Sequence, residues 1–275
     1  MSNINNFDLI LKQLKKKNTN VSDFLGKHVH LGYWPTPISK KISVDIAAEN
    51  LSKEICLYAQ IKNGQNILDV GCGFGGTISY LNENFSNLKL LGLNIDARQL
   101  DVAKKNICSK HQNNLSFVHD DACTMDKIYE KFDHIIAIEC LFYFSSRFSF
   151  FEQSLKYLKK GGSITISDFI MSPFLIPTCK FLNIVKCKWL NPFGSLNFVT
   201  LKKYYDLSHR FNLKIEVYDI TGNTILSYDV LKNMMSEFGL NKFKVFLWKR
   251  GCSLLKFFAY IEFNRYLIIK FTRTC

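Results

Sequence analysis

The sequence lacks the marks of a secreted or membrane-spanning protein. Residues 1–6 hold no basic run followed by an apolar core, so we expect no signal peptide. The most apolar segment, residues 169–190, is interrupted by prolines and lysines and cannot supply the roughly 20 apolar residues of a transmembrane helix. We therefore expect no transmembrane segment, and peripheral contact with a membrane is left open.

The sequence also shows no spacing of cysteines that indicates disulfide pairs. The nine cysteines form an odd set without a Cys-x-x-Cys pair, and Cys72 lies inside a glycine-rich turn. This usage favours reduced thiols and predicts a cytoplasmic protein. His28 and His30 alone are too few for a metal site, so no metal is expected.

Acidic residues are scarce beside basic ones. The chain has 36 Lys and Arg against 23 Asp and Glu, a net charge of +13. Such a charge can attract nucleic acid or an anionic membrane. The basic residues are spread over many segments, with the densest run at 242–250, and we interpret them mainly as solvated faces. An acidic partner is the alternative.

What the sequence does contain is an alternation of strands and helices. Apolar runs that predict strands are separated by helical segments, and they lie at 65–70, 89–95, 115–120, 132–139 and 162–170. Strands that are apolar throughout indicate a parallel sheet covered on both faces. We predict a doubly wound α/β fold, with its ligand at the carboxyl ends of the strands. Two later runs, 213–220 and 266–273, complete a mostly parallel, seven-stranded sheet.

Helical segments outside these strands predict a lid and a cap. Apolar residues at helical spacing indicate helices over 7–14 and 39–58, within an N-terminal helical lid at 1–63. Residues 64–275 then form the main, ligand-binding domain. Its helical cap insertions are expected at about 172–200 and 222–262.

The stretch NILDVGCGFGG, residues 66–76, carries the clearest chemical signal. The spacing of Gly71, Gly73 and Gly76 also fits a dinucleotide fingerprint. Asp69 argues against a dinucleotide, because a carboxylate beside the turn repels the phosphates that a helix N-terminus attracts. S-adenosylmethionine has no phosphate. Asp69 can accept a hydrogen bond from its ammonium, while N–H groups of the turn suit its carboxylate.

LDVGCGFGG resembles motif I of the class I S-adenosylmethionine-dependent methyltransferases. The resemblance continues from HLGYW at 30–34 through DITGNTILSY at 219–228 to the last strand. It is greatest for the small-molecule branch that includes tocopherol C-methyltransferases and antibiotic sugar O-methyltransferases. It implies a Rossmann-like methyltransferase fold, S-adenosyl-L-methionine as the cofactor and a small-molecule acceptor as the partner.

The resemblance implies cofactor contacts after the second and third strands. Asn94 stands where many relatives have a ribose-binding acid, and Gln99 matches a glutamine of relatives that lack this acid. Asp96 is expected to cap the following helix. Asp121 would accept from the adenine amino group, with the N–H of Ala122 facing the ring.

Further cofactor contacts are expected from the fourth strand and the lid. Glu139 lies at the strand end, and Tyr33 with Trp34 would lie near the sulfonium, since aromatic faces suit a cation. Asp120 is expected to face solvent, and a helix cap formed with Asp120 is the alternative for Asp121. The predicted cofactor-binding residues are Asp69, Gly71, Gly73, Asn94, Gln99, Asp121, Ala122, Glu139 and Tyr33.

The predicted catalytic residues are Asp168 and Tyr143. Methyl transfer needs mainly alignment, and a base only when the acceptor must lose a proton. Relatives often have a histidine where this chain has Tyr143, and a phenol is a poorer base at neutral pH. Asp168 matches the carboxylate partner of that histidine and is the candidate for acceptor contact or base. An aromatic packed under the cap and a plain strand-end aspartate are the alternatives, with His28 and His30 as reserve bases.

The sequence thus predicts an enzyme of class EC 2.1.1.- that methylates an oxygen, carbon or nitrogen of a small, partly apolar molecule. A natural product, lipid or quinone precursor would fit, with the insertion 169–190 forming much of the acceptor pocket. A nucleic-acid methyltransferase is one alternative, although ECLFYF at 139–144 lacks the Asn/Asp-Pro-Pro-aromatic run of enzymes that hold a flipped base. A non-catalytic cofactor-binding subunit is the other. The oligomeric state is not readable from the sequence.

Overall fold

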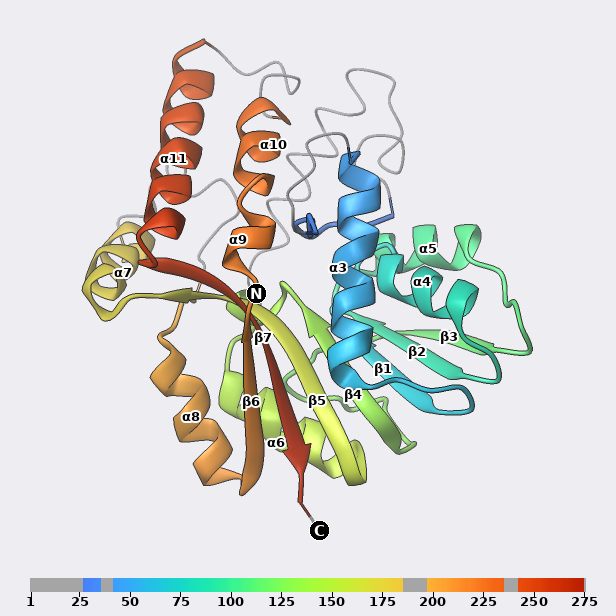
Figure 1. Cartoon of the computed structure of the whole chain (residues 1–275). Coiled ribbons are helices and arrows are strands. Elements are labelled where there is room, and N and C mark those ends of the chain that lie inside the picture. Colours follow the sequence, from blue (N-terminus) through green and yellow to red (C-terminus); the bar gives the residue numbers. More distant parts are fainter. Residues whose placement is uncertain (1–26, 36–41, 185–196, 235–241, 275) are drawn as a thin grey trace.

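The computed structural model describes residues 27–35, 42–184, 197–234 and 242–274. Seven strands form one sheet in the order β3-β2-β1-β4-β5-β7-β6 (Figure 1). Strand β7 runs antiparallel to both of its neighbours, and the other pairs are parallel. The strands are β1 Asn66–Val70, β2 Lys89–Asn94, β3 Asn114–His119, β4 Phe132–Ile138, β5 Leu158–Met171, β6 Leu213–Asp219 and β7 Asn264–Arg273. The predicted mostly parallel, seven-stranded sheet is confirmed.

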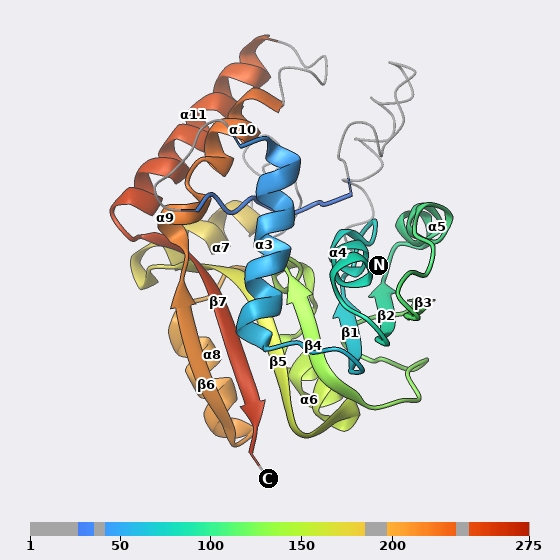
Figure 2. The ribbon, with the colours of Figure 1, turned by 45° about the vertical axis from the view of Figure 1, so that its right-hand side comes forward.

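Helices cover both faces of the sheet, as expected of a doubly wound fold (Figure 2). One face carries α3 (Val44–Ala59), α4 (Gly76–Asn84) and α5 (Ala97–Asn106). The other carries α6 (Arg147–Tyr157) and α8 (Leu201–Arg210). Helix α3 begins after Ser43, whose hydroxyl accepts from the N–H of Ile46, and its apolar residues recur at helical spacing on the buried side.

The cap is built from short helices at the carboxyl end of the sheet (Figures 1 and 2). It comprises the 3-10 turn η2 (Pro173–Leu175), α7 (Ile176–Ile184), α9 (Thr221–Thr224), α10 (Ser227–Met234) and α11 (Lys242–Tyr260). Among the described residues, none of the helices combines the length and the apolar character needed to cross a membrane.

Two expectations about the helices need comment. The helix expected over 7–14 and residues 185–196 of the expected insertion lie outside the described residues. Helix α8 was not predicted, although Tyr204 and Leu207, three residues apart, form its buried side. That amphipathic spacing is the signal that could have revealed it.

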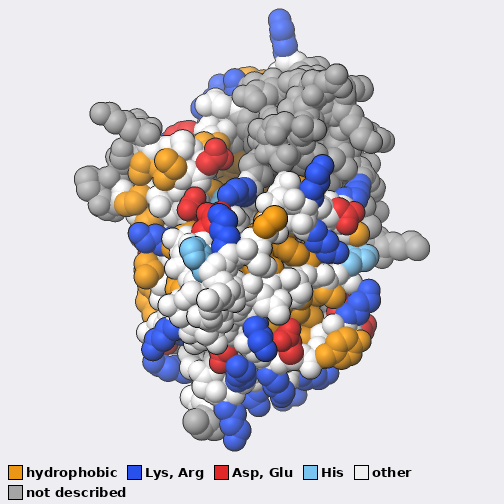
Figure 3. All heavy atoms as spheres, turned by 90° about the vertical axis from the view of Figure 1, so that its right-hand side faces the viewer, with side chains coloured by type: hydrophobic (Ala, Val, Ile, Leu, Met, Phe, Trp, Pro, Cys, Tyr) orange, Lys and Arg blue, Asp and Glu red, His pale blue; other side chains and the backbone are white. Residues whose placement is uncertain are grey.

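The surface on the side of α4 and α5 mixes charges of both signs (Figure 3). Arg98 pairs with Asp96 at 2.7 Å, and Lys110 lies 3.5 Å from Glu83. On this face the basic side chains are therefore scattered among acidic ones, in keeping with solvated helix faces.

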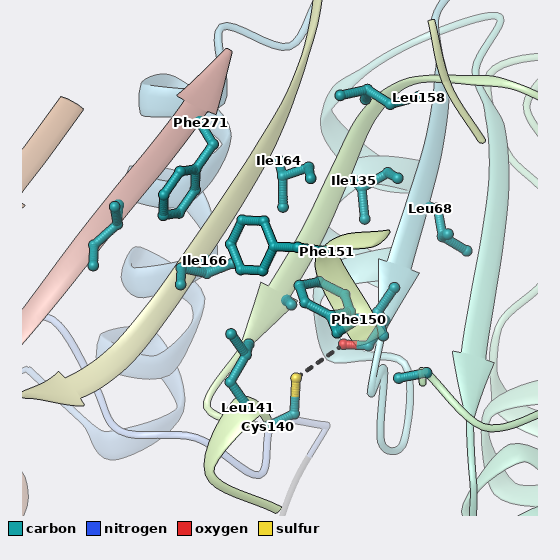
Figure 4. Close-up of a cluster of buried hydrophobic side chains, with 14 of the residues drawn as sticks. Leu68, Ile135, Cys140, Leu141, Phe150, Phe151, Leu158, Ile164, Ile166 and Phe271 are labelled. Atoms are coloured by element: carbon teal, nitrogen blue, oxygen red, sulfur yellow. Dashed lines mark hydrogen bonds between the residues drawn. The ribbon is translucent and has the colours of Figure 1, made fainter. Parts of the chain in front are cut away.

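Alternation along the central strands separates two apolar cores. Leu68 and Val70 of β1 face α6 and α8, while Ile67 and Asp69 face the side of α3 and α4. The core beneath α6 joins aromatic and aliphatic side chains of the strands with those of the helix (Figure 4). Asp69 thus enters the opposite, lid-side core at the carboxyl end of its strand.

Candidate functional site

The glycine turn after β1 has the backbone that only glycine adopts easily. Gly71, Gly73 and Gly75 have φ of 72°, 56° and 81°. A Cβ on Gly71 would lie 2.7 Å from the Cβ of Cys140, so the turn is also packed tightly against β4. At Gly73 the nearest atom to such a Cβ would be 3.4 Å away. The turn therefore places the Gly73 backbone beside the Val29 side chain and leads directly into the N-terminus of α4.

Asp69 is a buried carboxylate with an unsatisfied oxygen. Its side chain is 2% exposed, and Oδ2 has no hydrogen-bond partner among the described residues. Burial raises the pKa of this carboxyl to about 7. A buried acceptor without a donor is costly, so this oxygen suits a ligand that brings a cation or an N–H group.

Asn94 and Gln99 come together at the end of β2. The Asn94 amide donates to Gln99 Oε1 at 2.7 Å, and Asn94 Oδ1 accepts from the N–H of Ile95 at 3.1 Å. The Gln99 oxygen lies 3.9 Å from where a Cβ on Gly73 would stand. Asp96 caps α5 by accepting from the N–H of Arg98 at 3.0 Å, as expected.

The segment after β3 contradicts the expectation for Asp120 and shows the alternative that was given for Asp121. Asp120 does not face solvent: it is buried, and its two oxygens accept from the N–H groups of Asp121 and Lys127 at 2.9 and 2.8 Å. Asp121 Oδ1 accepts from the N–H of Cys123 at 2.8 Å, which is the cap geometry given as its alternative. Ala122 is buried next to it.

Glu139 joins residues 27–35, a described part of the expected lid that precedes α3, to the sheet. Its Oε1 accepts from the N–H of Leu31 and from the hydroxyl of Tyr266, both at 2.7 Å. Burial raises the pKa of Glu139 to about 7, against the lowering effect of these two donors. The residue has φ of 49°, so the strand ends there and the side chain turns toward the lid. Attachment of the lid is the role that these contacts support.

Tyr33 and Trp34 differ in their surroundings. Trp34 is 3% exposed, and its backbone N–H donates to the carbonyl of Asn223 at 2.8 Å, which connects the lid to the cap. The Trp34 ring belongs to the packed interior, the alternative to a place beside the sulfonium. Tyr33 is half-buried, and its N–H donates to the carbonyl of Ala47 in α3 at 2.7 Å.

His28 and His30 form a pair that locks the lid onto α4. His28 Nδ1 lies 3.1 Å from His30 Nε2, and His30 Nδ1 lies 2.9 Å from the carbonyl of Leu31. A Cβ on Gly76 would stand 2.4 Å from His28 Nδ1. Burial lowers the pKa of His28 to about 3 and that of His30 to about 4. Both rings are neutral near pH 7 and are weak bases, so packing is the role that the geometry supports.

The structure gives Asp168 partners that sequence reasoning missed. The carboxylate is fully buried, accepts from the Arg147 guanidinium at 2.8 Å, and accepts a short hydrogen bond from the Tyr204 hydroxyl. Arg147 also donates to the carbonyl of Asn197 at 2.6 Å. A carboxylate held by a guanidinium and a phenol is poorly suited to act as a base. The lone arginine in the apolar segment around α6 was the signal for this ion pair.

Tyr143 belongs to an aromatic group at the ends of β4 and β5. It lies in the 3-10 turn η1 (Leu141–Tyr143), is 41% exposed, and its ring centroid is 4.6 Å from that of Phe142. Phe142, Phe169 and Phe198 have ring centroids 5.9 to 6.4 Å apart. Burial and nearby Glu139 raise the pKa of Tyr143, which favours a donor over a base.

Comparison with known proteins identifies the central part of the chain. Residues 67–162 match a family described as a methyltransferase domain. An O-methyltransferase of Pyrenophora dematioidea is 26% identical over 152 residues, which cover 55% of this chain and 57% of that protein. Methyltransferase GfsG of Streptomyces halstedii is 29% identical over 145 residues, which cover 52% of this chain and 51% of that protein. The matched region thus spans about half the length of these curated relatives.

Solved structures share the fold over nearly the whole chain. The mycolic acid cyclopropane synthase CmaA1, solved with S-adenosylhomocysteine and CTAB, has a TM-score of 0.77 at 14% identity, covering 97% of this chain and 95% of its own. The [4+2]-cyclase SpnF has a TM-score of 0.72 at 18% identity, covering 98% and 94%. Together with the family match and the relatives, these likenesses confirm the predicted resemblance and the Rossmann-like methyltransferase fold.

Proposed function

We propose that this chain, whose residues 67–162 match a methyltransferase-domain family, transfers the methyl group of S-adenosyl-L-methionine to an oxygen, carbon or nitrogen of a small, partly apolar molecule. The observation that carries the proposal is the buried, unpartnered Oδ2 of Asp69 beside a glycine turn. An ammonium group satisfies that oxygen, whereas a pyrophosphate does not. Relatives that are O-methyltransferases support the reaction class.

The cofactor would be held along the carboxyl ends of β1, β2 and β3. Asp69 takes the ammonium of its methionine part, and the backbone N–H at Gly73 takes the carboxylate, since the N–H of Gly71 already donates to the carbonyl of Leu93 at 2.7 Å. The Asn94–Gln99 pair takes the ribose hydroxyls with neutral hydrogen bonds. These roles are supported by the proximity of Gln99 to Gly73.

The adenine would lie beyond the ribose, next to the segment that follows β3. Asp121 Oδ2 is the oxygen proposed to accept from the adenine amino group, since Oδ1 already caps Cys123. The N–H of Ala122 faces the ring in this arrangement. Tyr33 covers the methionine end from the lid.

The acceptor is proposed to lie against the aromatic group at the ends of β4 and β5. Phe142, Phe169 and Phe198 offer an apolar wall, and the more exposed Tyr143 offers a hydroxyl donor at its edge. The raised pKa of Tyr143 keeps the phenol protonated at neutral pH. It therefore orients the acceptor by donating a hydrogen bond.

When bound, the cofactor supplies a methyl group on a positively charged sulfur, ready for in-line displacement. The chain contributes alignment, which in well-oriented systems supplies up to about 7–11 kcal/mol of the barrier reduction. Asp168 is proposed as a positioning residue: through Arg147 it fixes the carbonyl of Asn197, next to Phe198 of the acceptor wall. The described site thus favours an acceptor atom that attacks without a strong protein base.

Two alternatives have less support. On the face shown in Figure 3 the basic side chains are interspersed with acidic ones, unlike a nucleic-acid footprint. A non-catalytic subunit would show decay of the cofactor site, but the glycine turn and the Asn94–Gln99 pair are formed. The unpaired cysteines favour a reducing compartment, and we propose the cytoplasm.

The test is incubation of the purified chain with methyl-labelled S-adenosylmethionine and a cell extract, with the label followed by mass spectrometry. A labelled small molecule that forms with the chain and not with an Asp69→Ala variant supports the proposal. Calorimetry gives the affinity for the cofactor separately. Tight cofactor binding without any labelled product would support the non-catalytic alternative instead.

A further inference from the structure

Helix α11 has the composition of an interfacial helix. Its 19 residues, KFKVFLWKRGCSLLKFFAY, contain five Lys or Arg and no Asp or Glu. Large apolar side chains on it are exposed: Phe243 is 62% exposed, Phe246 52%, Phe257 54% and Tyr260 66%. Helices that rest on a membrane surface combine basic residues with a face of Phe, Trp and Leu in this way.

The other side of α11 is firmly packed, so the exposed stripe is not a sign of a loose helix. Trp248 Nε1 donates to the carbonyl of Leu231 in α10 at 2.7 Å. Lys256 pairs with Asp229 of α10 at 2.6 Å, and Cys252 is buried between them and the core. The stripe is therefore presented on a rigid support.

A second element extends the stripe. The N–H of Ser172 donates to the carbonyl of Phe263 at 2.8 Å, which brings η2 and α7 to the end of α11. The rings of Phe174 and Phe263 are stacked, with centroids 6.5 Å apart. Exposed aromatic rings lie on α7, on α11 and on their flanks, and we call this set of residues the aromatic edge: Phe174, Phe181, Phe243, Phe246, Phe257 and Phe263. Exposed apolar groupings of this kind mark interaction sites.

We infer that the aromatic edge docks onto the surface of an anionic lipid bilayer. The positive charge of α11 favours an anionic membrane as the partner. Each basic residue near such a membrane strengthens binding roughly fivefold, and the aromatic rings insert between the lipid headgroups. Arg250 lies 5.3 Å over the ring of Phe246, so cation and aromatic reach the same depth. A second copy of the chain fits less well, since a two-fold contact would face α11 with its own positive charges.

Docking in this way has a consequence for the acceptor. In Figures 1 and 2, α10 and α11 stand over the carboxyl end of the sheet, where the acceptor is proposed to bind. The acceptor would then be a molecule that dissolves in the bilayer, a part of the inference that rests on the proposed function.

The experiment is flotation of the purified full chain with two kinds of vesicle, pure phosphatidylcholine and a phosphatidylcholine–phosphatidylglycerol mixture. The variants are Phe246→Ser/Phe257→Ser, with Tyr129→Ser as the aromatic control, because Tyr129 is 88% exposed in the connection between β3 and β4. The charge variant is Lys242→Gln/Arg250→Gln. Lys104→Gln/Lys105→Gln on α5 removes the same charge from another face.

We expect the native chain to float with the anionic vesicles, and salt to weaken that binding. The aromatic and charge variants of α11 should each bind roughly tenfold or more weakly, while both controls keep native binding. No binding to anionic vesicles would overturn the inference, and so would equal losses in the controls. It would also be overturned by sedimentation that shows a dimer which Phe246→Ser/Phe257→Ser dissociates, with no binding to lipid.

The failure of this inference is distinguishable from that of the proposed function. Calorimetry with S-adenosylmethionine should give the same affinity for the native chain and the four α11 and control variants. Labelled methyl transfer is then compared between lipid and aqueous fractions of a cell extract. Label in an aqueous acceptor alone would overturn the bilayer acceptor and leave the methyltransferase intact.

Discussion

Binding of S-adenosylmethionine is expected to release a proton from Asp69. In the free protein, burial raises the pKa of this carboxyl from its usual 3.8 to about 7, and Oδ2 has no donor. A bound ammonium would stabilise the ionised form and return the pKa toward its ordinary range. At about pH 6 roughly 0.9 proton should leave per cofactor bound, and affinity should be roughly eightfold higher at about pH 7.5.

The measurement is calorimetry in two buffers of different ionisation enthalpy, from about pH 5.5 to about pH 7.5. In this window a cofactor amine with the usual α-amino pKa stays mostly protonated. His28 and His30, with pKa values lowered to about 3 and about 4, do not titrate there. Glu139 has a pKa raised to about 7, so a variant must separate the two carboxyls.

Asp69→Asn is that variant. Because the pKa of this carboxyl is raised, its protonated form stabilises the folded protein. This contribution to stability is fully present below about pH 4 and is lost as the pH rises through about 7. An amide resembles the protonated form, so the variant should fold at neutral pH. It should bind roughly tenfold or more weakly and show no proton release. Unchanged release in Asp69→Asn, or none in the native protein, would refute the reasoning.

Three further outcomes are expected. Arg147→Met leaves the Asp168 carboxylate buried without its cation, and should lower the free energy of unfolding by about 3–5 kcal/mol in a denaturant titration. Lys156→Met, on the exposed side of α6, is the control. A decrease for Arg147→Met no larger than that of the control would argue against the ion pair. Gln99→Leu removes the acceptor of the Asn94 amide and should raise the dissociation constant of the cofactor roughly threefold to tenfold. A cofactor affinity equal to that of the native chain would remove Gln99 from the site. Gly76→Ala places a Cβ against His28 Nδ1, and should weaken binding of the cofactor by displacing the lid. Gly222→Ala, whose Cβ would have nothing within 4 Å, serves as the control. Equal cofactor affinities of the two variants would show that the lid does not contribute to binding.

Local features of the sequence predicted much of the fold. The seven strands lie within one or two residues of the expected runs at most ends, because apolar periodicity and glycine turns act over short stretches of chain. The exception is β5, which begins at Leu158, four residues before the run expected at 162–170. There Gly161, at φ of 74°, permits a conformation that few other residues adopt.

The site was predicted in part. The residues around β1 and β2 were proposed for the site because the glycine turn and its neighbours are a contiguous signature, and the structure brings Gly73, Asn94 and Gln99 together. The prediction for Asp120 was wrong, because the local sequence around an aspartate next to a turn is the same whether its oxygens face water or accept from N–H groups. Asp168 was judged without its partners, which lie 21 and 36 residues away.

The sequence by itself determined the order of strands and helices and the chemistry of the turn at Asp69, since both follow from backbone sterics and side-chain periodicity within a few residues. The tertiary structure alone decided which charges are neutralised. Glu139 meets the N–H of Leu31 across 108 residues, and Arg147 meets Tyr204 across 57. Burial then raises the pKa values of Asp69 and Glu139, because the energy of an ion depends on the surroundings that distant parts of the chain provide.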